Sequence, residues 1–320
     1  MTAPRTGWAP RVPAAVMRAG VGWLGGKRCL DPALPWPVQR TRLDRMCRAG
    51  VLPRGTTITR TTLAGVPAEV VSGRRLDSAR GPDSARTIVH FHGGGYCVGS
   101  ALTPRAWAAH LAARTGGRVV LPEYRLAPEH PHPAALHDAR AVITALSGQV
   151  KPGSIVVSGD SAGAGLALAL TLSLRDAGHE DAAQQLPAGC ILLSPWLDLG
   201  RDRRADPALV RSDVLLSPGW LDACARAYAG PDAWTDPSVS PLHAPPGGLP
   251  PLLIQAGTDE LLAPDAASLA ASAAAAAVDV TYTRYPRMWH DFPLQAGLVT
   301  AADSAVAQAA WFAGRVTAGS

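Results

Sequence analysis

The sequence predicts an α/β protein: a mostly parallel eight-stranded sheet that is flanked by helices and carries a helical cap. From residue 87 onward, short runs of β-branched and apolar residues alternate with helix-length segments, which is typical of such a sheet. Two glycine-rich turns each follow one of these runs. The chain has 320 residues, of which 47% are hydrophobic and 17% charged, so it can bury a sizeable core.

The elements follow in order along the chain. Residues 1–50 contain helical pieces that Pro32, Pro35 and Pro37 are expected to break. Residues 74–86 form a polar loop between the first two strands and the alternating region. Strands are expected at Thr56–Leu63, Val66–Val71, Thr87–Phe91, Arg118–Leu121, Ser154–Ser158, Gly189–Leu193, Leu252–Gln255 and Asp279–Tyr285. Helices are expected at Pro104–Thr115, Ala134–Leu146, Ala162–Asp176, Pro218–Ala229, Asp265–Ala277 and Ala301–Val316.

One long segment interrupts the alternation. Residues 197–249 hold a charged stretch, one helical piece and a proline-rich tail. Ligands of such sheets bind at the carboxyl ends of the strands, so an insertion there would cover the pocket. We therefore expect cap helices over residues 1–55, a core over 56–196, a cap insertion over 197–249 and the rest of the core over 250–320.

A run of three glycines follows the strand at Thr87–Phe91. Consecutive glycines cost backbone entropy, and nothing about core packing requires them. They allow backbone N–H groups to approach another group closely and to point at it. We expect the N–H groups of Gly94 and Gly95, together with that of Ala162, to form an oxyanion hole. His92 is expected to hold this loop in shape by a hydrogen bond.

A candidate nucleophile lies about seventy residues further on. The segment Gly159-Asp160-Ser161-Ala162-Gly163 places Ser161 on a tight turn between a strand and a helix, the G-x-S-x-G pattern of hydrolytic serines. A serine hydroxyl needs a base to remove its proton, and that base is commonly a histidine held by a carboxylate. Asp160 is expected to have an orienting role only, because adjacent side chains on a sharp turn point apart.

The remaining partners are expected in the order serine, acid, histidine. Asp259 follows the strand at Leu252–Gln255, and we choose it as the acid, with Glu260 as its nearest competitor; Asp265 is expected at the start of a helix. His290 follows the last strand and is chosen as the base.

Composition excludes several other classes. The five cysteines are scattered, with no zinc-like spacing, which indicates no metal site and favours a reducing cytoplasm. No apolar run reaches transmembrane length, and no signal peptide is expected. Residues 1–50 hold nine Lys/Arg against two Asp/Glu, without the basic–aromatic pattern of nucleic-acid binding. Weak contact of this segment with an anionic membrane surface is one interpretation, and a solvated face on a covering helix is the simpler one.

Together these segments resemble the hormone-sensitive-lipase-like family of α/β-hydrolases, in its bacterial esterase branch. The matching segments are His92-Gly93-Gly94-Gly95-Tyr96, Tyr124 to Pro131, Gly159 to Gly163, Ser194 to Leu199, Asp259 to Leu262 and Trp289 to Phe292. The resemblance implies the α/β-hydrolase fold, a triad of Ser161, Asp259 and His290, and no cofactor. It also implies hydrolysis of short- to medium-chain acyl esters, and many members are homodimers. Residues 1–50 match no named motif.

Two alternatives stay open on the sequence. The same triad could serve an amidase or deacetylase, and a cyclic ester (a lactone) is a further candidate substrate. A non-catalytic module that binds a small ligand is the rival from another class; the presence of both Ser161 and His290 argues against it.

Overall fold

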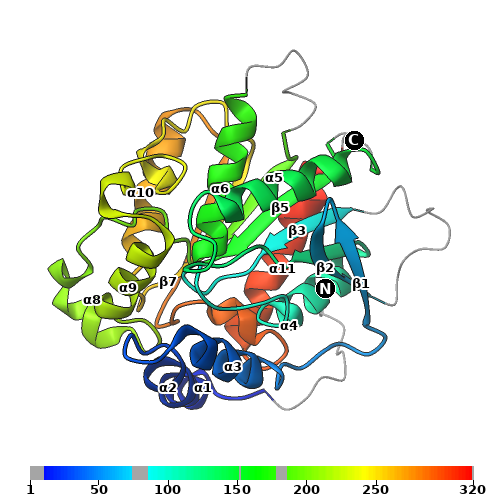
Figure 1. Ribbon diagram of the computed structural model, residues 1–320. Helices are drawn as coiled ribbons and strands as arrows, with labels where there is room; N and C mark the ends of the chain where they lie inside the picture. Colours follow the sequence, from blue (N-terminus) through cyan, green and yellow to red (C-terminus); the bar gives the residue numbers. More distant parts are fainter. Residues whose placement is uncertain (1–10, 74–85, 151–152, 178–185, 319–320) are drawn as a thin grey trace.

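The computed structural model describes residues 11–73, 86–150, 153–177 and 186–318. Within them, eight strands form one sheet in the order β1-β2-β4-β3-β5-β6-β7-β8 (Figure 1). Strands β3 to β8 run parallel, while β2 pairs with both β1 and β4 in the antiparallel direction. The predicted mostly parallel eight-stranded sheet is confirmed. The predicted loop 74–86 lies, apart from Arg86, outside the described residues.

The bounds of the elements agree closely with those that the sequence predicts. The strands are β1 Thr57–Leu63, β2 Val66–Ser72, β3 Thr87–Phe91, β4 Arg118–Pro122, β5 Ile155–Asp160, β6 Gly189–Leu193, β7 Leu252–Gly257 and β8 Val280–Tyr285. The helices that flank the sheet are α4 Arg105–Thr115, α5 Ala134–Ser147, α6 Ala162–Arg175, α10 Ala263–Ala275 and α11 Thr300–Val316.

The first two strands form a hairpin whose turn is set by two residues. Leu63 pairs with Val66, so Ala64 and Gly65 alone make the connection, with φ values of 47° and 86°. Two positive φ values are the mark of the turn whose twist matches that of the strands. Glycine adopts this conformation readily, which is why Gly65 indicates the turn in the sequence.

The central strands of the sheet are buried on both faces, whereas the edge strands β1 and β8 are partly exposed. Along β3, Ile88 belongs to a core cluster with α4 and α11, whereas the next residue, Val89, belongs to the cluster with α5, α6 and α10. The same alternation recurs in β5 at Val156 and Val157. In β3, β5, β6 and β7 every residue is buried rather than every second one, as expected for parallel strands between two helix layers.

Two groups of helices lie outside this core. The first comprises α1 Ala14–Val21, η1 Gly22–Gly26, α2 Lys27–Cys29 and α3 Trp36–Cys47, the blue segments at one end of the molecule (Figure 1). The second, between β6 and β7, includes α8 Pro207–Ser212 and α9 Pro218–Tyr228. Pro37 does not break a helix, contrary to the sequence-based expectation. It lies in the first turn of α3, where proline has no hydrogen bond to lose.

In the described part of the chain, no helix combines the length and the apolar character that crossing a bilayer would require.

Candidate active site

Ser161 occupies a sharp turn between β5 and α6. Its backbone has φ 53° and ψ −121°, a conformation that non-glycine residues adopt rarely and that is typical of serines held at a strand-to-helix turn. The turn closes because the chain approaches itself at two glycines. A Cβ on Gly159 would lie 2.2 Å from the carbonyl oxygen of Gly163, and one on Gly163 would lie 2.1 Å from that of Phe91.

The glycine loop after β3 lies against this turn. The N–H of Gly93 donates a hydrogen bond of 3.0 Å to Oδ2 of Asp160, so it is not free for a ligand. Among the described residues, the N–H groups of Gly94 and Gly95 donate to no protein acceptor. Gly94 also lines the cavity beside Ser161, whereas Gly95 and Ala162 are not among the lining residues.

Three side chains fix the position of this loop. The ring of His92 donates from Nδ1 to the carbonyl oxygen of Gly93 at 2.8 Å, as the sequence predicts, and the Tyr124 hydroxyl donates to the carbonyl of His92. Asp160 connects the loop to the core, since its Oδ1 lies 2.8 Å from Nε2 of the buried His90. The orienting role expected of Asp160 therefore has a specific basis: it holds the N–H of Gly93.

His290 follows β8 and contacts a carboxylate that differs from the one chosen on sequence. Its Nδ1 lies 3.3 Å from Oε2 of Glu260, and both side chains are buried. Asp259 instead forms an ion pair of 2.8 Å with Arg18 of α1. The choice of Asp259 as the partner of His290 is thus corrected to Glu260. The two neighbours point in different directions on the turn, and only Glu260 points into the protein.

Burial and neighbouring charges shift the pKa values of Glu260 and His290 in opposite directions. Burial raises the pKa of Glu260, although its hydrogen bond with His290 acts in the other direction. Burial alone would lower the pKa of His290, but the carboxylates of Asp291 and Glu260 together hold it well above its ordinary value. The arrangement therefore favours the imidazolium form of His290.

Asp291 was not anticipated from the sequence as part of this site. Its backbone has φ 55° and ψ 28°, and its Oδ2 lies 3.1 Å from Nε2 of His290, the nitrogen that does not face Glu260. Burial raises the pKa of Asp291 to about 7, with His290 opposing the shift. The hydroxyl of Ser161 makes no hydrogen bond with any residue of the described ranges. Asp291 thus contacts Nε2 of His290, the ring nitrogen that would have to accept the proton of Ser161. The one sequence signal for this contact is that Asp291 directly follows His290.

A cavity of about 310 Å³ brings these groups together. Its polar lining includes Ser161, His290, Asp160 and Asp291. Most of the remaining lining is apolar. Much of it comes from the N-terminal helices and from the segment between β6 and β7: Met17, Val21, Leu24, Leu43, Met46, Leu215, Leu216 and Trp220. Its volume falls at the small end of the range for sites that enclose small molecules.

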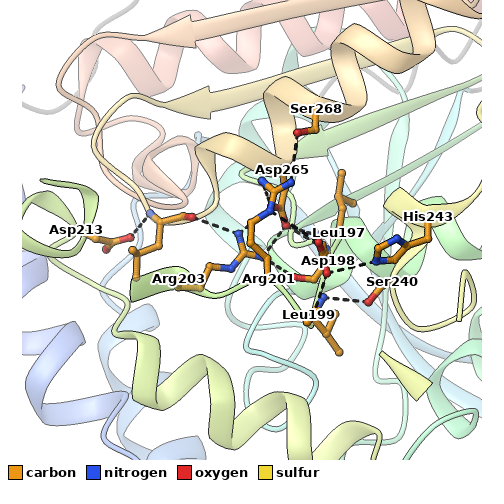
Figure 2. A network of polar contacts seen from close by, with 12 residues as sticks. Leu197, Asp198, Leu199, Arg201, Arg203, Asp213, Ser240, His243, Asp265 and Ser268 are labelled. Carbon is orange, nitrogen blue, oxygen red and sulfur yellow. Dashed lines mark hydrogen bonds and ion pairs between the residues drawn. The ribbon is translucent and has the colours of Figure 1, made fainter. Parts of the chain in front are cut away.

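The segment between β6 and β7 is fastened to the loop that carries Glu260. Oδ2 of Asp213 accepts a hydrogen bond of 2.8 Å from the N–H of Leu261. Figure 2 shows a second connection, at the buried Asp265 of α10. Its carboxylate pairs with Arg203 and Arg201 and accepts hydrogen bonds from the N–H groups of Leu197 and Asp198. Asp265 does lie in the first turn of its helix, as predicted, but its carboxylate faces the inserted segment.

Comparisons with known proteins agree with the observed fold. Residues 88–294 match the family model described as the alpha/beta hydrolase fold. An esterase of Acinetobacter venetianus is 37% identical over 278 residues, which cover 86% of this chain and 87% of that protein. An acetyl-hydrolase of Streptomyces hygroscopicus is 40% identical over 207 residues, 64% of this chain and 67% of its own. A crystal structure of an esterase from the bacterial hormone-sensitive lipase family superimposes with a TM-score of 0.85 at 31% identity, covering 97% of this chain and all of that one.

Proposed function

Because the chain belongs to the hormone-sensitive-lipase-like branch of the α/β-hydrolase family and is a carboxylic ester hydrolase, we propose that it acts through an acyl-enzyme on Ser161. One observation carries the proposal. Ser161 and His290 line the same cavity, and the buried Glu260 contacts His290 from behind that lining. Its substrates are esters with acyl chains of short to medium length.

The proposed reaction begins with the transfer of a proton. His290 must be neutral and must turn Nε2 from Asp291 to the hydroxyl of Ser161. Ser161 Oγ then attacks the ester carbonyl carbon while Nε2 takes its proton, and Glu260 stabilises the resulting imidazolium at Nδ1. The carbon–oxygen bond to the alcohol breaks, and the alcohol leaves with the proton from His290. Water repeats the two steps on the acyl-enzyme and releases the carboxylic acid.

Backbone N–H groups would stabilise the tetrahedral intermediate. Within the described ranges, the N–H groups of Gly94 and Gly95 donate to no protein acceptor. The N–H of Ala162 lies at the start of α6, where the helix itself offers no acceptor for it. One such donor is typically worth about 2.7–4 kcal/mol of activation free energy. The lack of protein acceptors for these N–H groups among the described residues supports the oxyanion hole of Gly94, Gly95 and Ala162 that the sequence predicts.

The cavity supports the proposed substrate size. A volume of about 310 Å³ with mainly apolar lining suits a short acyl chain and an alcohol of similar size. We assign residues 1–55 and 197–249 to a cap, since α1, α3 and the segment at Leu215 and Leu216 supply much of that lining. A lactone contains the same carbonyl group within a ring and would react by the same steps.

Replacing the candidate nucleophile tests the proposal. Ser161→Ala should lower kcat for p-nitrophenyl butyrate by at least about 10⁴-fold, because the covalent route is lost. Ser272→Ala, on the exposed side of α10, is the matched control and should keep full activity. Near-normal turnover by a folded Ser161→Ala variant would contradict the proposal. A panel of p-nitrophenyl esters, lactones and anilides would then define the acyl length and leaving group.

A further inference from the structure

The outer side of α1 and η1 exposes apolar side chains without a charge among them. Val16 and Trp23 are each 61% exposed and Leu24 is 46% exposed. The single charged residue of α1, Arg18, turns inward to Asp259 and to the carbonyl of Ser212. A helix that is apolar on both its inner and outer sides normally lies in a core or against another apolar phase. On this chain the outer side of α1 meets solvent.

Cationic side chains lie beside this apolar face and on the adjoining helix α3. The guanidinium of Arg28 lies 3.9 Å from the ring centre of Trp23, and Arg42, Arg45 and Arg48 are exposed on or just after α3, which contacts η1. The acidic residues described nearby are already engaged: Asp31 accepts from the N–H of Ala33, and Asp44 accepts from the Ser100 hydroxyl. We call Val16, Trp23 and Leu24, with Arg28, Arg42, Arg45 and Arg48, the cap face.

The cap face is continuous with the substrate cavity. Leu24 is exposed to solvent and also lines the cavity, and Met17 and Val21, on the same helical segment, line the cavity as well. Leu24 thus belongs to both, so the exposed apolar surface meets the wall of the cavity that contains Ser161.

We propose that the cap face docks on an anionic lipid surface and that the enzyme draws ester substrates from it. Apolar side chains enter the boundary of the acyl chains while Arg side chains pair with anionic headgroups, which is how interfacial helices bind. A second copy of the chain fits this face less well, because a two-fold contact would set the same arginines against one another. The uptake of substrate rests on the proposed function; the docking itself does not.

Vesicle sedimentation with the full chain tests the docking. The wild-type protein should sediment with vesicles of phosphatidylcholine and phosphatidylglycerol, bind vesicles of phosphatidylcholine alone more weakly, and detach at high salt. Trp23→Ser and the double variant Arg45→Glu/Arg48→Glu should each weaken binding about tenfold or more. Trp311→Ser is the matched control, since Trp311 is 57% exposed on α11 and also lies near an arginine, Arg315, at 5.3 Å.

Several results would overturn the proposal. These are absence of wild-type sedimentation, equal binding to both vesicle types, or an equal loss in Trp311→Ser. Sedimentation velocity adds a further one: a dimer that Trp23→Ser dissociates would mean that a second copy covers the face. Turnover of soluble p-nitrophenyl acetate by Trp23→Ser should match the wild type, which shows that this variant is folded. Ser161→Ala should bind vesicles normally, so failure of docking and failure of the proposed chemistry are distinguishable.

Discussion

At the scale of single residues, the carboxylate that supports His290 depends on a contact from the other end of the chain. The sequence narrows the candidates to Asp259 and Glu260, because both follow the end of β7. It cannot separate them, since two neighbours on a turn differ only in the direction of their side chains. Arg18, 241 positions away, binds Asp259 at 2.8 Å, and Glu260 is left to point at His290. No local pattern in the sequence encodes that long-range ion pair.

Replacing each of the two carboxylates by its amide distinguishes the roles of Glu260 and Asp259. Glu260→Gln should lower kcat/KM for p-nitrophenyl butyrate by about 10³–10⁴-fold, because the imidazolium loses its stabilising charge. Asp259→Asn removes an ion pair that is partly exposed and should change kcat/KM by less than about tenfold. Steady-state kinetics on both variants, with circular dichroism to verify folding, measures the difference. A greater loss in Asp259→Asn would restore the sequence-based choice.

Asp291 sets the pH range in which His290 can act as a base. Catalysis requires neutral His290, and the negative charge of Asp291 favours the imidazolium and raises the pKa of His290. Activity should therefore rise with pH as His290 loses its proton. Asp291→Asn removes that charge, so the acid limb of log kcat/KM should move to lower pH. Glu260, Asp213 and Asp160, the other acidic groups that act on the pair, stay in place.

The control for this pH profile is Asp279→Asn. Asp279 pairs with Arg315 at the surface, and its replacement should leave the acid limb where it is. An unchanged profile in Asp291→Asn, or a shift to higher pH, would show that Asp291 does not act on the proton of His290.

At the scale of elements, the ion pairs at the start of α10 hold the inserted segment to the core. The carboxylate of Asp265 is fully buried and forms an ion pair of 2.8 Å with Arg203, whose side chain is 3% exposed (Figure 2). Asp265→Asn leaves a buried guanidinium without its counter-charge. It should lower the free energy of unfolding by about 3–5 kcal/mol, measured by urea denaturation.

A surface pair gives the comparison for this effect. Asp176 pairs with Arg175 while 62% exposed, and Asp176→Asn should change the free energy of unfolding by less than about 1 kcal/mol. If Asp265→Asn proved equally mild, the buried cluster would not be what fastens the inserted segment.

The elements differ in how far sequence predicts them. The core strands and helices follow from periodicity and from glycine at turns, and their bounds agree with the structure to within a few residues. The glycine loop is predictable in kind, because three consecutive glycines after a strand let backbone N–H groups approach another group closely. The need for glycine at position 93 in particular is not predictable. A Cβ there would lie 2.3 Å from Oδ2 of Asp160, and this contact joins the ends of two different strands.

At the scale of the whole molecule, strand order brings distant segments to one edge of the sheet. Strands β3, β5, β7 and β8 are spread from residue 87 to residue 285, yet their carboxyl ends carry the glycine loop, Ser161, Glu260 and His290. Parallel pairing and chain order predict that convergence from the sequence. The way α1 and α3 close the cavity is not predicted, because residues 1–50 match no motif and their position depends on contacts such as that of Arg18.

Covalent labelling of the serine tests the central claim most directly, because it reports nucleophile and base in one experiment. Wild-type protein incubated with a fluorophosphonate should gain one adduct, which peptide mapping assigns to Ser161. Labelling should disappear in Ser161→Ala and slow greatly in a folded His290→Gln variant, which lacks the base. An adduct on any other residue, or no adduct on folded protein that hydrolyses esters, would contradict the account.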